Sequence, residues 1–93
     1  MKVPELIFFK DNWIIIKGYI NPKIREEIKK IPGWYFDPEE ELFYLELIPA
    51  AIRPIKDFIN IYGLEYSDKA WNAIQKRLRL FIEKENQNEN PAL

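Results

Sequence analysis

The stretch that most constrains the fold is residues 31–47, which read IPGWYFDPEEELFYLEL. Two aromatic and aliphatic runs, 34–36 and 42–47, flank the turn-forming pair Asp37 and Pro38. Proline presets the backbone of a type I turn, and the aspartate before it accepts hydrogen bonds from the turn amides. Because aromatic and β-branched runs favour strands, the stretch predicts a β-hairpin over 34–47.

The spacing of this hairpin predicts a register as well. A four-residue loop pairs Phe36 with Glu41 and Trp34 with Phe43, so that Trp34, Phe36, Phe43 and Leu45 share one face. We expect that face to lie on the core, with Trp34 buried in it. Tyr35, Leu42, Tyr44 and Glu46 then share the opposite face.

A second hairpin is predicted over 5–17, because two apolar runs flank Asp11 and Asn12, which both tolerate positive φ in a tight turn. If Lys10 pairs with Trp13, Phe9 faces Ile14 and Ile7 faces Ile16, which gives one apolar face. The other face is mixed. It carries Leu6, Phe8, Lys10, Trp13, Ile15 and Lys17.

Three helices are predicted from capping residues and from apolar side chains at helical spacing. Asn21 and Pro22 begin a helix over 22–31. A second helix over 53–62 ends at Gly63, and we expect its regular part to begin near Arg53 because Pro54 disfavours a helix interior. Ser67 or Asp68 caps a third helix over 68–85.

The predicted fold is therefore α+β, with two hairpins and three helices in the order ββαββαα. We expect an antiparallel or mixed sheet with the helices packed on one face. The 93 residues are enough for one domain over 1–85, and the polar residues 86–93 are expected to be a tail or linker.

Composition excludes several classes of function. The chain has no cysteine and no histidine, so a thiolate metal site and a histidine-dependent nucleophile are both absent. With three glycines and no Gly-Lys-Ser/Thr motif it has no phosphate-binding loop. The acidic turn at 37–41 cannot enclose a cation, so we expect no metal, no cofactor and no enzyme activity. A small carboxylate-dependent enzyme ranks last, since no converging acid pair supports it.

The residues also bear on location. No signal peptide or membrane-spanning run is recognisable, which favours a cytoplasmic protein that does not bind membranes. Frequent isoleucine, lysine and glutamate are typical of thermophile proteins, although an AT-rich genome gives the same usage.

Two groups of cations could contact phosphates despite the net charge of −1. The first predicted helix carries Lys23, Arg25, Lys29 and Lys30, and the third carries Lys69, Lys76 and Arg79 in one stripe with Asn72. Such stripes also occur on any solvated helix. Trp13 and Tyr35, with Phe8 and Tyr44, could stack on unpaired bases, although strand aromatics more often belong to a core.

The motifs of residues 21–63 resemble the HARP domain that precedes the motor of annealing helicases. They are Asn21-Pro22, the IKKIPG of 28–33, the WYFDPE of 34–39, an aromatic residue at Phe43 or Tyr44, and a helix that closes at Gly63. The chain is similar also to the damage-recognition domain at the N-terminus of archaeal XPB-type helicases, with the likeness extending through the GLEYSD of 63–68.

This resemblance covers about half of the chain and implies an accessory DNA-binding module for a superfamily 2 helicase motor in repair or fork remodelling. Such a module would recognise forked, distorted or partly single-stranded DNA. The family usually has Lys or Arg after the Asp-Pro-Glu turn, where this chain has Glu40 and Glu41, so we expect the helices to make the DNA contacts. The alternative is a protein-interaction module that docks on a helicase or nuclease partner.

Overall fold

The computed structural model describes residues 3–88, with side chains up to residue 82. The described residues form an α+β fold in the predicted order ββαββαα, with one additional short strand before the last helix. The elements are β1 (Glu5–Lys10), β2 (Trp13–Lys17), α1 (Pro22–Ile28), β3 (Trp34–Asp37), β4 (Leu42–Glu46), α2 (Pro49–Tyr62), β5 (Glu65–Tyr66) and α3 (Asp68–Asn88).

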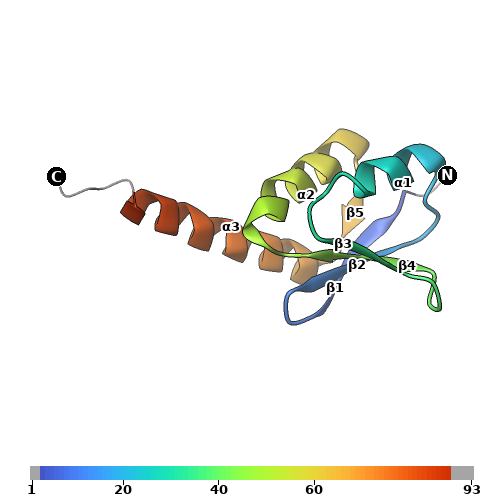
Figure 1. Cartoon of the computed structure of the whole chain (residues 1–93), viewed down its shortest axis with the longest axis horizontal. Coiled ribbons are helices and arrows are strands. Elements are labelled where there is room, and N and C mark those ends of the chain that lie inside the picture. The colour runs from blue at the N-terminus through green and yellow to red at the C-terminus, as the bar shows by residue number, and fades with distance from the viewer. Residues whose placement is uncertain (1–2, 89–93) are drawn as a thin grey trace.

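The strands form one mixed sheet in the order β3-β4-β2-β1-β5 (Figure 1). The two hairpins are joined through antiparallel pairing of β2 with β4, and β5 adds to β1 in parallel. β5 lies in the link between α2 and α3, where it pairs with Glu5 and Leu6.

The helices cover one face of this sheet, as predicted. Its inward side chains form a single core with apolar residues of all three helices. The sheet contributes Leu6, Ile14, Ile16, Phe43 and Leu45, and the helices contribute Ile24, Ile28, Ala51, Ile52, Ile55, Phe58, Ile59, Ala70 and Ile74. α2 lies between the other two helices. Its residues line one cavity together with residues of α1 and another cavity together with residues of α3.

The register of the first hairpin is not the predicted one. Lys10 pairs with Trp13 as expected, but Phe8 rather than Phe9 pairs with Ile14, and Ile7 pairs with Ile15. Phe9 is the extra residue of a β-bulge, which reverses the facing of every residue before it. Leu6 and Phe8 therefore face the core, while Ile7 and Phe9 do not.

The second hairpin keeps the predicted faces in a register shifted by two residues. Phe36 pairs with Phe43 and Trp34 with Leu45, so the four-residue loop begins after Asp37. The Asp37 side chain accepts hydrogen bonds from the amides of Glu39 and Glu40, which stabilises the turn. The prediction that Trp34 is buried was wrong, because β3 is an edge strand and leaves the indole 38% exposed.

Two helix boundaries also differ from the predicted ones. α1 ends at Ile28, and bonds from Lys30 to Glu27 and from Ile31 to Ile28 continue the chain in tighter turns, because Pro32 keeps Ile31 out of a helix. α2 begins at Pro49 and runs through Pro54, and burial of Ala51 and Ile52 stabilises this extra turn.

The third helix begins as predicted but ends later. Ser67 caps α3, since its Oγ accepts a hydrogen bond from the amide of Ala70. The helix continues to Asn88, so residues 86–88 are helical where a tail was expected, and residues 89–93 lie outside the described residues. Of the described helices, none is both long and apolar enough to cross a membrane.

Candidate nucleic-acid interface

The sheet face opposite the helices is rich in aromatic side chains. Cross-strand pairing places Tyr35, Tyr44, Ile15 and Ile7 in one row across four strands. Ile15 is only 7% exposed and yet lies outside the core that the helices complete. Its neighbours in the sheet therefore shield it, and the helices do not.

Three other aromatic rings surround Tyr44 on this surface. The centroid of Tyr44 lies 5.7 Å from that of Phe9, 6.2 Å from that of Trp13 and 6.0 Å from that of Tyr35. Phe9 and Tyr35 are 45% and 52% exposed. We call Phe9, Trp13, Tyr35 and Tyr44 the aromatic face.

The charges around the aromatic face differ between its two ends. At the Phe9 end, the ammonium of Lys10 lies 5.2 Å from the centroid of the Phe9 ring. At the other end lies the acidic β3–β4 turn. Partial burial, and after it the negative charges of Asp37 and Glu40, raise the pKa of the Tyr44 phenol. In the described part of the chain, no group of three or more carboxylates is arranged to hold a metal ion.

On the helical side of the first hairpin, an open cavity of about 490 Å³ lies between the hairpin and α3. It is lined by Phe8, Asp11, Lys69, Asn72, Ala73, Lys76 and Arg77. We call it the hairpin groove. Its cations outnumber its acids by three to one, with Lys69, Lys76 and Arg77 against Asp11, so it favours an anionic ligand.

Arg77 is the fixed cation of the hairpin groove. Its Nε donates to the side-chain oxygen of Asn12, and a terminal nitrogen donates to the carbonyl of Asp11 at 3.2 Å. Asn12 in turn donates to the carbonyl of Leu47 at 3.3 Å. Lys69 and Lys76 are exposed beside this anchored guanidinium.

The predicted cations of α1 lie elsewhere. Lys30 is paired with Glu27 at 3.1 Å, and Arg25 lies 5.9 Å from the centroid of the Phe43 ring. Lys23 and Lys29 are exposed. Because α2 lies between α1 and α3, the two predicted groups of cations form separate surfaces (Figure 1).

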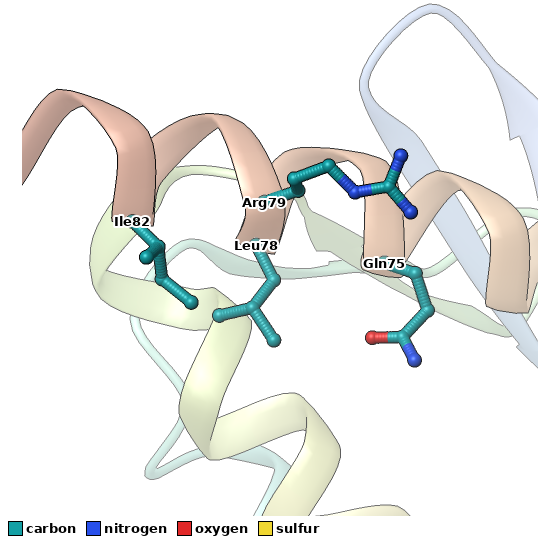
Figure 2. Close-up of a pocket in the computed structure, with 4 residues that line it drawn as sticks. All are labelled: Gln75, Leu78, Arg79 and Ile82. Atoms are coloured by element: carbon teal, nitrogen blue, oxygen red, sulfur yellow. The ribbon is translucent and has the colours of Figure 1, made fainter.

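Arg79 is separated from Lys69 and Lys76 although it shares their helix. It lines a different, shallow groove with Gln75, Leu78 and Ile82. In Figure 2 the side chain of Leu78 points toward α2, whereas that of Arg79 extends along α3 away from α2. The predicted stripe is therefore divided between two surfaces.

The structure thus brings together some of the predicted residues and not others. Trp13 and Tyr35 both contact Tyr44 on the aromatic face, and Lys69 and Lys76 share the hairpin groove. Phe8 lines the groove, because the bulge turns it away from the aromatic face. Sequence reasoning missed Phe9, since no residue pattern marks the bulge, and it did not include Arg77, whose partners lie far away in the sequence.

Comparison of the chain with protein-family models, with curated proteins and with solved structures finds no match.

Proposed function

We propose that this protein is an accessory DNA-binding module that recognises forked, distorted or partly single-stranded DNA. The observation that carries the proposal is that the aromatic face and the hairpin groove lie on opposite sides of one hairpin. Phe9 and Phe8 are consecutive residues of β1, and one belongs to each surface. β5 pairs with Glu5 and Leu6, and within residues 3–88 no strand pairs with the far half of β1 on that edge of the sheet.

A DNA strand that passes around this part of β1 would meet two kinds of contact. Lys69, Lys76 and Arg77 are placed to bind backbone phosphates in the hairpin groove. Unpaired bases beyond them could stack on Phe9, Trp13 and Tyr35, and such stacking contributes about 1–3 kcal/mol per base irrespective of sequence. Lys10 lies beside the Phe9 ring and precedes Asp11 of the hairpin groove in the sequence.

The combination favours a junction over a plain duplex. Bases in a duplex are stacked on each other and cannot reach the rings, whereas a fork offers both paired and unpaired segments. The net charge of −1 limits long-range attraction, so binding should be modest and sensitive to salt.

The resemblance to HARP and XPB-type domains supports a helicase motor as the partner that uses this binding. Weak binding suffices in such an arrangement, because a linked or docked motor raises the effective concentration of the DNA.

The test is a titration with forked, duplex and single-stranded DNA at two salt concentrations. A variant with Trp34→Phe and Trp71→Phe keeps Trp13 as its one tryptophan, and the fork should quench its fluorescence. Lys69→Glu with Lys76→Glu should abolish fork binding, while Lys23→Glu with Lys30→Glu, an equal charge change on α1, should leave it intact. Equal affinity for fork and duplex, or no binding at low salt, would contradict the proposal.

A second candidate is a module that docks on a helicase or nuclease partner through the aromatic face. The acidic turn beside Tyr44, which contributes to the raised pKa of the phenol, is the observation in its favour, since it opposes an anionic ligand there. Charge reversal of Lys69 and Lys76 separates the candidates. Under this second function partner binding survives the reversal, and DNA binding is absent from the unmodified protein.

A further inference from the structure

β3 is an edge strand with backbone groups available for another strand. Its inner neighbour is β4, and the described residues supply no strand on its outer side. The amide of Trp34 donates to the carbonyl of Ile31 at 3.3 Å, so it takes no part in the ladder with β4. Because bonding alternates along an antiparallel strand, the amide and carbonyl of Phe36 point outward as well.

The rim of this edge is cationic and aromatic. Arg25 on α1 and Lys29, the residue that caps the end of α1, lie four positions apart. With Trp34, Phe36 and Phe43 they line a cavity of about 180 Å³ beside β3. In the described structure neither Arg25 nor Lys29 forms an ion pair with a carboxylate. Trp34 lines this cavity and remains 38% exposed.

We infer that β3 and this rim form a docking site for an acidic, extended peptide segment of a partner protein. The segment adds as a strand along β3, and its backbone bonds with Phe36. Its carboxylates on the helical side meet Arg25 and Lys29, and the apolar side chains that alternate with them lie on the opposite face of the sheet. The inference uses different cations from the DNA-binding proposal, since Arg25 and Lys29 do not line the hairpin groove. The two proposals share only β3, on whose opposite face Tyr35 lies.

Two other occupants fit this edge less well. A second copy paired antiparallel along β3 would place its own α1 on the same side of the joined sheet. Arg25 and Lys29 of both copies would then face one another, which is repulsive. A nucleic acid would satisfy the two cations, but it has no peptide groups to pair with the outward amide and carbonyl of Phe36.

The test uses the whole protein and short synthetic peptides as probes. In the first peptide glutamate alternates with valine. In the second the central valine is proline, which cannot continue a ladder, and in the third lysine replaces glutamate. Each is titrated against isotope-labelled protein by nuclear magnetic resonance, with hydrogen exchange of the Phe36 amide as a second readout.

We expect the first peptide to shift the Phe36 and Trp34 signals and to slow exchange of the Phe36 amide, and the other two to do neither. Arg25→Glu with Lys29→Glu should remove binding. Lys23→Glu with Lys30→Glu, the same charge change at two cations that do not line the cavity beside β3, should retain it. Circular dichroism confirms that each variant is folded.

Several results would overturn the inference. Equal binding of the alternating and the proline peptides would show that no strand is added. Unchanged binding to Arg25→Glu with Lys29→Glu would show that the rim cations do not select the peptide. Displacement of the peptide by single-stranded DNA, with the DNA itself shifting Arg25 and Lys29, would assign the rim to nucleic acid.

Discussion

Arg77 on α3 donates a hydrogen bond to the side chain of Asn12 in the β1–β2 turn, 65 positions away in the sequence. Asn12 also exchanges two bonds with Leu47, since its carbonyl accepts from the Leu47 amide at 2.8 Å and its side chain donates to the Leu47 carbonyl. One turn residue therefore fixes both the end of β4 and the position of α3. This connection determines the width of the hairpin groove.

Replacing Asn12 by alanine should lower the free energy of unfolding by about 1–3 kcal/mol, because partly buried groups of Arg77 and Leu47 lose their partner. Urea denaturation measures the change. Lys76→Ala, at an exposed neighbour of Arg77, should stay within about 0.5 kcal/mol. Equal losses in the two variants would show that the Asn12 bonds contribute no stability.

Deleting Phe9 should leave the fold intact and weaken the binding of single-stranded DNA. Phe8 and Lys10 become consecutive, and they already pair with the consecutive residues Ile14 and Trp13, so the hairpin becomes regular. The lost ring removes stacking of about 1–3 kcal/mol per base.

Phe9→Ala is the matched variant, because it retains the bulge and removes the ring. Both variants should lose a similar part of the affinity, as measured by fluorescence anisotropy of a labelled strand. A deletion variant that binds like the unmodified protein would show that Phe9 has no part in binding.

Gly63→Ala should destabilise the protein by about 1–2 kcal/mol. Gly63 ends α2 with φ of 60° and ψ of 42°, a left-handed conformation that costs most other residues energy. Apart from Gly63 itself and its two chain neighbours, no atom of the described residues lies within 4 Å of an added Cβ, so the cost is one of backbone conformation. Gly63→Asn should cost less, because asparagine tolerates this region, and thermal unfolding gives the order of the two variants. An alanine variant as stable as the unmodified protein would contradict this account.

The raised pKa of Tyr44 predicts a loss of stability in alkali. In the folded protein burial and the charges of Asp37 and Glu40 favour the neutral phenol, so its folded pKa exceeds the unfolded value of 10.0. The folded state then holds the proton more tightly. The protonated Tyr44 phenol therefore stabilises the folded state fully below pH 10, and this stabilisation is lost as the pH rises through the folded pKa.

Denaturation at several alkaline pH values tests this expectation. Tyr44→Phe should make the curve of stability against pH shallower above pH 10. Asp37→Asn should lower the phenol pKa in a spectrophotometric titration. The same Tyr44 pKa in the Asp37→Asn variant would exclude the carboxylate as a cause.

The architecture was predictable because its signals are local. Asn21 accepts a hydrogen bond from the amide of Ile24 at 2.8 Å, Ser67 caps α3, and Gly63 ends α2 in the left-handed region. Each of these residues acts within one helical turn of its position in the sequence. Alternation of apolar residues then assigned the faces of the second hairpin correctly, since a register shift of two preserves them.

The features that were not predicted depend on distant partners. Phe8 and Phe9 are chemically identical in the sequence, and packing against α3 selects Phe8 for the inner side. Trp34 has a large apolar side chain of the kind usually found in a core. It is exposed because β3 is the last strand of the sheet. Arg77 acquires its role only because the fold brings the β1–β2 turn beside α3.

The central position of α2 has a consequence for how many ligands the molecule can hold. It is a ridge of 14 residues with the α1 rim on one side and the hairpin groove on the other. An occupant of the α1 rim would therefore not displace phosphates bound in the hairpin groove. Under both proposals the molecule would bind a nucleic-acid strand and an acidic segment of another protein at the same time, and so would hold the two together.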